Sequence, residues 1–187
     1  MSEVPEHVLT AIARHLTKKA QEEPPQEQKP DSSPLVPHVS IATLNRLFNS
    51  ELEAIHEYTG HYAVALSMGY TKLAAALLER LNDERKHADM LAYRIVFLGG
   101  SIVVDAPITA GCGTEVEQMH RMDLAKEQGA SKDYNEAVEE ARTAKDNVSR
   151  MMLESILKDE DDHIDENSTE LDKIRRMGLQ QYLVTQV

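Results

Sequence analysis

Two seven-residue segments of the chain carry the same pattern: Asp83-Glu84-Arg85-Lys86-His87-Ala88-Asp89 and Asp159-Glu160-Asp161-Asp162-His163-Ile164-Asp165. Both read D-E-x-x-H-x-D, and they lie 76 residues apart. The same offset relates Glu51 to Glu127 and Tyr58 to Tyr134. Each half of the sequence therefore has one glutamate followed, 33 residues later, by an E-x-x-H motif, which indicates an internal repeat of two helical hairpins.

Four long stretches with a helical period of apolar residues surround these motifs. They span about 41–68, 71–98, 114–142 and 145–176, and a short segment at 179–187 follows. Ser40 is the expected N-cap of the first stretch, and Gly69 is expected to end it. Thr114 and Glu117 form a capping box that is expected to start the third stretch.

The lengths of the links between these stretches predict how the helices are connected. The links at 69–70 and 143–144 are short and join antiparallel neighbours, whereas the link at 99–114 is long enough to cross the bundle lengthwise. Within that crossover, Ile102–Val104 is the only candidate strand. The sequence predicts an all-α, antiparallel four-helix bundle with one long crossover and a short C-terminal helix.

The first 37 residues differ from the rest of the chain. They contain six of the seven prolines, so the predicted domains are an N-terminal appendage at 1–37 and the helical bundle at 38–187. Within the appendage, helical periodicity predicts a short amphipathic helix at about 5–20, and residues 21–37 are typical of an extended polar linker. The helix at 5–20 would dock on a partner; alternatively, the appendage is a poorly ordered tail.

Composition excludes several classes of function. The net charge is −12, so neither nucleic acid nor an anionic membrane is an expected partner. The single cysteine, Cys112, permits no intrachain disulfide or thiolate cluster and suits a reducing, cytoplasmic location. No apolar run is long enough to span a membrane, and no secretory signal is recognisable at the N-terminus.

The repeated motif has a chemical reason. Positions i and i+3 of a helix lie on one face, so each E-x-x-H can point a carboxylate and an imidazole at one spot. Two such helices, each beside a helix that offers one glutamate, bring four carboxylates and two imidazoles together, as in di-iron and di-manganese carboxylate proteins. Four carboxylates balance two divalent cations. Oxygen and imidazole ligands suit Fe, Mn, Co or Zn, and affinity alone does not select iron.

For single residues, an ordinary structural role is the alternative to a role at a metal site. One E-x-x-H motif alone is usually a solvated helix face, and the metal hypothesis depends on the two matched copies. Tyr58 and Tyr134 lie on buried stripes, where a tyrosine is more often a core residue with a satisfied hydroxyl. The histidines without a paired ligand at suitable spacing are expected to be surface or structural residues: His7, His15, His38, His56, His61 and His120.

Together these motifs resemble the bacterioferritin family of the ferritin-like superfamily, from about Ala42 to Gln186. The matching segments include Glu51-Leu52, Ala54-Ile55, Tyr58, Asp83-Glu84, Lys86-His87-Ala88-Asp89, Asp123-Leu124-Ala125, Glu127, Ile156-Leu157, Asp159-Glu160, His163-Ile164-Asp165 and Met177-Gly178-Leu179-Gln180. The resemblance implies a ferritin-like bundle over nearly the whole of residues 38–187.

The resemblance also implies a function and a set of site residues. Members of the family bind two irons per subunit, oxidise Fe²⁺ with O₂ or H₂O₂, and store the ferric mineral in a hollow cage of 24 subunits. Carried over to this chain, the ligands are Glu51 and His87 for one iron, Glu127 and His163 for the other, and Glu84 and Glu160 as bridges. Tyr58 would donate a hydrogen bond near the site. Glu79 and Asp83 occupy positions that bind a further iron in some members; alternatively, they belong to an ordinary polar helix face.

One position departs from the family. Bacterioferritins ligate haem with a methionine directly after the bridging glutamate of the second helix, and this chain has Arg85 there. A guanidinium offers no lone pair to a haem iron, so we expect the homo-oligomer to bind no haem. Co-assembly with a haem-bearing subunit stays open.

Three functions remain open from the sequence. The leading hypothesis is an iron-storage ferroxidase that forms a cage. The second is a di-iron peroxidase that protects against oxidative damage without bulk iron storage, and the third is a helical scaffold without activity. The sequence leaves open the native metal, the choice between O₂ and H₂O₂, and the partner that releases iron.

Overall fold

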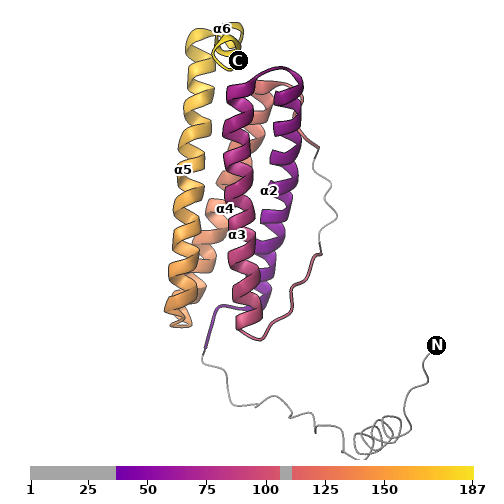
Figure 1. The fold of residues 1–187 in the computed structure, drawn as a ribbon. Helices are drawn as coiled ribbons and strands as arrows, with labels where there is room; N and C mark the ends of the chain where they lie inside the picture. The colour runs from indigo at the N-terminus through magenta and orange to yellow at the C-terminus, as the bar shows by residue number, and fades with distance from the viewer. Residues whose placement is uncertain (1–36, 106–110) are drawn as a thin grey trace, which may run out of the picture. The chain divides into compact units, whose positions relative to one another are not determined.

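The computed structural model describes residues 37–105 and 111–187, and this part of the chain is helical without strands. The helices are α2 (Ile41–Ser67), α3 (Thr71–Phe97), α4 (Val116–Thr143), α5 (Asn147–Met177) and α6 (Leu179–Val184). The predicted all-α four-helix bundle with a short C-terminal helix is confirmed (Figure 1). The amphipathic helix predicted at 5–20 lies outside the described residues.

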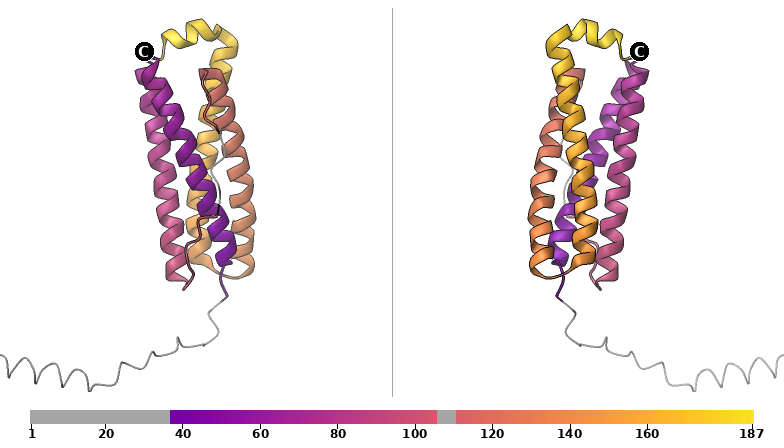
Figure 2. Two further views of the ribbon diagram at one scale, coloured as in Figure 1. Left: turned by 90° about the vertical axis from the view of Figure 1, so that its right-hand side faces the viewer. Right: turned by 90° about the vertical axis from the view of Figure 1, so that its left-hand side faces the viewer.

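The four long helices form two antiparallel hairpins that pack side by side. The α2–α3 hairpin and the α4–α5 hairpin each turn through a short link, as the views in Figures 1 and 2 show. The chain leaves α3 at one end of the bundle and starts α4 at the other, which agrees with the predicted lengthwise crossover. Helix α6 lies across the end of the bundle, where the N–H of Lys72 donates to the carbonyl of Gln186 (3.0 Å).

The first part of the crossover is extended and bound to α2 by two asparagines. Asn45 donates to the carbonyl of Ser101 (3.0 Å) and accepts from the N–H of Val103 (2.7 Å). One turn later, Asn49 donates to the carbonyl of Val103 (2.7 Å) and accepts from the N–H of Asp105 (3.0 Å). The candidate strand at Ile102–Val104 was therefore wrong, because side-chain amides take the place of a partner strand.

Of the two predicted helix starts, one is confirmed and one is wrong, and a further cap is seen at α5. The hydroxyl of Ser40 accepts from the N–H of Thr43 (3.1 Å), as expected of the N-cap of α2. Asp146 caps α5 by accepting from the N–H of Ser149 (3.1 Å). The predicted capping box at Thr114 was wrong: α4 begins at Val116 with Glu115 as N-cap, and the N–H of Thr114 donates to the side chain of Gln118 (3.3 Å).

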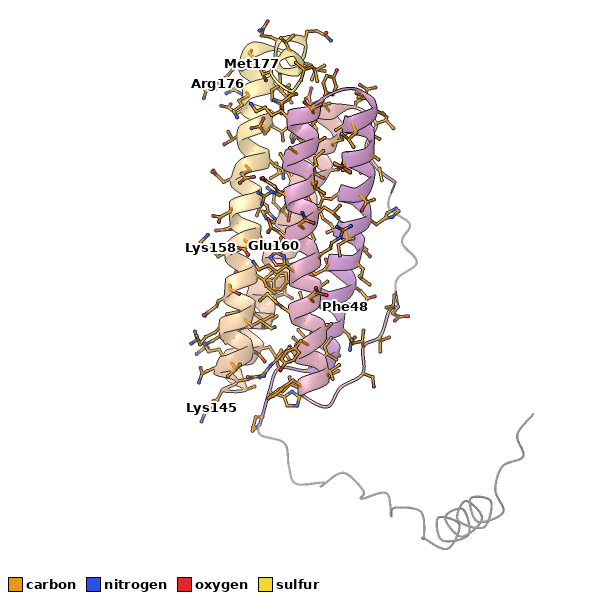
Figure 3. The ribbon with its side chains drawn as sticks, in the orientation of Figure 1. Phe48, Lys145, Lys158, Glu160, Arg176 and Met177 are labelled. Carbon is orange, nitrogen blue, oxygen red and sulfur yellow. The ribbon has the colours of Figure 1, made fainter. Side chains whose placement is uncertain are left out.

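The apolar core has two parts that lie at different heights of the bundle. One contains Leu44, Leu47, Leu91, Ile95, Tyr134, Ala137, Ala141, Leu153 and Ile156, and the other contains Ala54, Tyr58, Ala65, Leu73, Leu77, Leu81, Val116, Ile174 and Tyr182. On every long helix, buried charged residues separate the two parts. Figure 3 shows one of them, Glu160, about halfway along the bundle between α5 and α3.

None of the helices in the described ranges has the length and apolar character needed to cross a membrane.

Candidate metal centre

The six predicted ligands meet in the interior of the bundle. Each long helix supplies one glutamate, and α3 and α5 also supply one histidine each, because Glu and His three residues apart share a helix face. The six side chains are Glu51 on α2, Glu84 and His87 on α3, Glu127 on α4, and Glu160 and His163 on α5; each is at most 2% exposed. So little exposure leaves them no bulk water as a partner.

The six residues form two overlapping groups. Glu51 and His87 join the pair Glu84 and Glu160 in one group, in which one ligand atom of each residue lies within 4.8 Å of the others. The second group contains Glu127 and His163 with the same pair. Two groups that share two carboxylates can hold two ions with two bridges, which is the arrangement that the repeat predicts.

The histidines turn the same nitrogen towards the carboxylates. Nδ1 of His87 lies 3.3 Å from Oε1 of Glu160 and 3.4 Å from Oε2 of Glu84. Nδ1 of His163 lies 3.3 Å from Oε1 of Glu84 and 3.7 Å from Oε2 of Glu127. The two rings stack with their centroids 6.2 Å apart. Each histidine belongs to a group that contains both Glu84 and Glu160.

Unsatisfied polar atoms test whether metal ions fit here. Among the described residues, no hydrogen-bond partner is found for Oε1 of Glu84, for either carboxylate oxygen of Glu160, or for Nδ1 of His87 and of His163. Buried polar atoms without partners are costly. Carboxylate oxygens and imidazole nitrogens that converge in this way are the donor set of Fe²⁺, Mn²⁺, Co²⁺ or Zn²⁺, so the residues fit a pair of such ions.

The pKa values of the clustered side chains show that bound metal ions would replace protons. Burial raises the pKa of Glu51 to about 8 and that of Glu160 to about 10. Burial acts in the same sense on Glu84, but contacts with the two histidines outweigh it and lower its pKa. Burial alone would lower the pKa of both histidines; contacts with glutamates instead raise it to about 12 for His87 and about 9 for His163. The metal-free cluster therefore holds protons at neutral pH, and divalent cations would displace them.

Two tyrosines connect the halves across the centre. The hydroxyl of Tyr58 on α2 donates to Oε1 of Glu127 on α4, and the hydroxyl of Tyr134 on α4 donates to Oε1 of Glu51 on α2. Burial raises the pKa of both tyrosines well above its usual value. The predicted hydrogen-bond donor Tyr58 thus has a counterpart in Tyr134, and each holds the glutamate of the other half.

Two aspartates of the repeated motif contact the outer nitrogens of the histidines. Oδ2 of Asp159 lies 3.3 Å from Nε2 of His87, and Oδ2 of Asp83 lies 3.7 Å from Nε2 of His163. A carboxylate at this position fixes the ring orientation of a metal-binding histidine. Asp159 was not among the predicted site residues, although the first letter of D-E-x-x-H marks it in the sequence.

The other predicted positions lie on the surface of α3. Asp83, proposed for an accessory iron, also lies 3.3 Å from Nη1 of Arg80. Glu79, its proposed partner, is exposed. Arg85, which stands where the family has the haem methionine, is exposed with Nη1 3.4 Å from Oδ1 of Asn82.

One buried group was missed. Glu57, His61 and Asp123 place one ligand atom each within 4.8 Å of one another. His61 was expected to be a surface or structural residue without a paired ligand, yet Glu57 precedes it by one helical turn. That i, i+4 spacing was the available signal; Asp123 is too distant in the sequence to be paired with them.

Comparison with known proteins agrees with the motifs. The chain matches the family model of the ferritin-like domain over residues 41–177. It is 34% identical over 148 residues to the bacterial ferritin of Pseudomonas aeruginosa, which covers 79% of this chain and 96% of that protein. It is 33% identical over 142 residues to the bacterioferritin of Brucella melitensis (76% and 88% covered), and 33% identical over 147 residues to that of Streptomyces coelicolor (79% and 88%).

The family match covers well over half of the chain, and the identities exceed 30% over most of each of these relatives. The family match at 41–177 extends across all four helices that supply the clustered glutamates and histidines. The chain belongs to the bacterioferritin family of ferritin-like proteins.

Proposed function

We propose that this protein is an iron-storage ferroxidase, which oxidises Fe²⁺ with O₂ or H₂O₂ and keeps the ferric product in an oligomeric cage. The observation that carries the proposal is the pair of buried groups that share Glu84 and Glu160. Relatives named bacterioferritin and bacterial ferritin support it. Two Fe²⁺ ions held side by side supply one electron each, so that one O₂ with two protons gives H₂O₂, or one H₂O₂ with two protons gives two waters.

Each residue of the cluster has a role in that proposal. Glu51 with His87, and Glu127 with His163, would each bind one Fe²⁺, while Glu84 and Glu160 would bridge the two ions. The histidines and the bridging carboxylates are held in place before Fe²⁺ binds, because packing in the bundle fixes their helices. Preorganisation of this kind reduces the rearrangement needed when charge develops in the reaction.

The tyrosines and aspartates around the cluster act through the ligands. Tyr58 and Tyr134 hold one oxygen of Glu127 and of Glu51, which leaves the other oxygen free for the ion. Asp159 accepts a hydrogen bond from Nε2 of His87, and Asp83 lies 3.7 Å from Nε2 of His163. A carboxylate on that side favours a proton on Nε2, which leaves the lone pair of Nδ1 for the ion.

Storage requires assembly of many subunits, and we propose a homo-oligomer, a 24-subunit cage by resemblance to the family. An apolar strip on α3 supports subunit contacts: Tyr93 is 73% exposed, Phe97 66% and Val96 60%. An apolar strip of this kind on a helix commonly marks a protein–protein interface. A mass measurement of the native assembly tests the subunit number.

The ferroxidase proposal is tested by anaerobic loading with Fe²⁺ followed by mixing with O₂ or H₂O₂. A Glu51→Ala/Glu127→Ala variant should lose at least about 100-fold in the initial oxidation rate, because each ion loses a ligand. Glu136→Ala is the matched control, since Glu136 is an exposed carboxylate on α4. Unchanged oxidation in the double variant would contradict the site.

Iron capacity separates storage from a peroxidase without storage. The wild-type assembly should take up many more than two irons per subunit during repeated additions. Saturation at two irons per subunit would contradict the storage part of the proposal while leaving the oxidation site intact.

A further inference from the structure

A second group of buried acidic residues lies beside the candidate metal centre. Glu57 and His61 on α2 and Asp123 on α4 are 6%, 0% and 1% exposed. None of them belongs to the six clustered ligands. Asp123 precedes Glu127 by one turn of α4, and Glu57 is the neighbour of Tyr58, so the group lies on the α6 side of the centre.

The hydrogen bonds of His61 determine its role in this group. The backbone N–H of Gly113 donates to Nε2 of His61 (2.8 Å), so Nε2 is an acceptor and the ring proton lies on Nδ1. Nδ1–H then donates to Oδ1 of Asp123 (2.8 Å). His61 has no lone pair left for a metal ion. It fastens the crossover to the bundle and fixes the orientation of Asp123.

One carboxylate oxygen of each acid is unsatisfied. Within the described ranges, Oε1 of Glu57 and Oδ2 of Asp123 have no hydrogen-bond partner. Burial and the charge of Asp123 raise the pKa of Glu57, and burial raises that of Asp123. Two buried carboxylates close to each other are unfavourable unless a proton or a cation lies between them.

A cavity borders one of the two acids, Asp123. Asp123 lines a cavity of about 220 Å³ together with Tyr58, Arg80, Glu166 and Glu170. The volume admits several water molecules. Water in this cavity can complete a coordination shell to which the protein contributes only two ligands.

The neighbouring thiol bears on which cations fit. Cys112 packs against Gly60, where any side chain would collide with its sulfur. Burial, Glu57 and Asp123 all raise the pKa of this thiol, so it stays protonated and offers no thiolate. Two carboxylates without a thiolate favour hard cations that keep part of their water shell.

We propose that Glu57 Oε1 and Asp123 Oδ2 bind a hydrated divalent cation of the Mn²⁺, Fe²⁺ or Mg²⁺ type at a site separate from the two-ion centre. His61 is a positioning residue in this site. The site stands apart from the ferroxidase proposal, because it shares no ligand with the six clustered residues.

Mn²⁺ tests this site, because it is a hard cation with a distinctive electron paramagnetic resonance signal. The metal-stripped, full-length assembly is titrated with Mn²⁺ by equilibrium dialysis, and the spectra are recorded at each step. Wild-type protein should bind one more Mn²⁺ per subunit than Glu57→Gln, and this ion should give the six-line signal of an isolated Mn²⁺. Asp123→Asn should weaken that binding at least about tenfold.

Glu53→Gln is the matched control, since it removes one carboxylate from α2 one turn away, where Glu53 pairs with Lys126 (2.6 Å). The Glu53→Gln variant should keep the six-line signal of the isolated Mn²⁺. Circular dichroism and the assembly mass establish that each variant is folded. Equal Mn²⁺ stoichiometry and signal in wild type and Glu57→Gln would overturn the proposal and indicate that the two carboxylates share a proton. Binding at the two-ion centre, measured in the same titration, is independent of that outcome.

Discussion

The two halves of the bundle are alike at the candidate metal centre and unlike beside it. Each half supplies one glutamate, one E-x-x-H motif and one tyrosine that reaches across to the other half. The 76-residue offset takes Glu57, His61 and Asp123 to Asp133, Ala137 and Leu47. Ala137 and Leu47 are fully buried core residues, and Asp133 forms an ion pair with Arg46 (2.8 Å) near the surface.

This difference shows at which positions the chemistry of the site requires the two halves to have the same residues. A pair of ions with two bridging carboxylates needs equal ligands from both halves, and there the two halves match. Beside the centre, the two hairpins together place a buried acidic pair on the side of α6, Glu57 from α2 and Asp123 from α4, whereas the repeat-related positions Leu47 and Ala137 are buried apolar residues. The two halves therefore differ around Glu57 and Asp123, whereas the repeated ligand motif itself is symmetric.

The largest effect is expected from removal of a glutamate that we propose to bridge the two ions. Glu84 belongs to both ligand groups, so Glu84→Ala weakens both ion sites at once. We expect the rate of Fe²⁺ oxidation to fall at least about 100-fold, and Glu160→Ala to behave in the same way. Stopped-flow absorbance of the ferric product measures both rates. If Glu84→Ala or Glu160→Ala lost less activity than Glu51→Ala, the proposal that these two glutamates serve both ions would be contradicted.

Substitution of the two aspartates that lie next to the histidines should affect metal binding in the two halves to different extents. Asp159 lies closer to its histidine than Asp83 does (3.3 Å against 3.7 Å). Asp159→Asn should therefore weaken Zn²⁺ binding about tenfold, and Asp83→Asn by less. Calorimetric titration of both variants measures the difference. Equal losses would show that the distance does not matter.

The two tyrosines should contribute equally to the stability of the metal-free protein. Tyr58→Phe leaves Oε1 of Glu127 without its donor, and Tyr134→Phe does the same to Glu51. Each variant should lose about 2 kcal/mol of unfolding free energy, because a buried acceptor is left unsatisfied. Urea unfolding of the metal-stripped protein gives both values. A difference of more than about 1 kcal/mol between the variants would show that the halves are unequal.

Acid should destabilise the end of the bundle at which α5 begins, away from Glu57, His61 and Asp123. Asp146 caps α5 and pairs with Arg94 (2.8 Å), and although burial acts in the other direction, its bond to Ser149 holds its pKa below the usual value. Its contribution is present above the unfolded pKa of about 4 and is lost as the pH falls through the folded pKa. Asp146→Asn should cost about 1 kcal/mol at pH 7, because asparagine still caps the helix but no longer forms an ion pair with Arg94, and it should cost less at pH 3. An equal cost at both pH values would contradict this assignment.

The smallest effect is expected at the position after each bridging glutamate. Arg85 and its repeat counterpart Asp161 are both exposed. The homo-oligomer, prepared from cells supplied with haem, should show no absorbance of a haem with two methionine ligands. Arg85→Met should change the unfolding free energy by less than about 0.5 kcal/mol, as is usual for surface positions. One haem per dimer in the wild-type protein would contradict the expectation.

The sequence predicted the bundle, its crossover and the six clustered residues because all of these follow from local spacing. A helical period, an i, i+3 motif and a fixed repeat offset are visible without the fold. The bounds were less certain: the Thr114 capping box satisfied the sequence pattern, but the chain enters α4 two residues later with Gln118 bonded to the N–H of Thr114.

Contacts between distant segments could not be predicted in the same way. Tyr58 and Glu127 are 69 residues apart, and His87 and Asp159 are 72 apart. The rotation of each helix decides which acidic residue faces which ring, and the sequence does not give that rotation. The Asp123 and His61 pair was missed for this reason, and so was the pair of asparagines that binds the crossover.

The layer of charged residues between the two apolar cores has a consequence for cooperativity. In the metal-free protein this layer contains buried carboxylate and imidazole atoms for which no hydrogen-bond partner is found among the described residues, so it couples the two apolar parts less strongly than continuous apolar packing would. Each end can then open locally without the other. Ions that bind all four helices at mid-height would link the ends into one cooperative unit, and amide hydrogen exchange at both ends would slow together when metal is added.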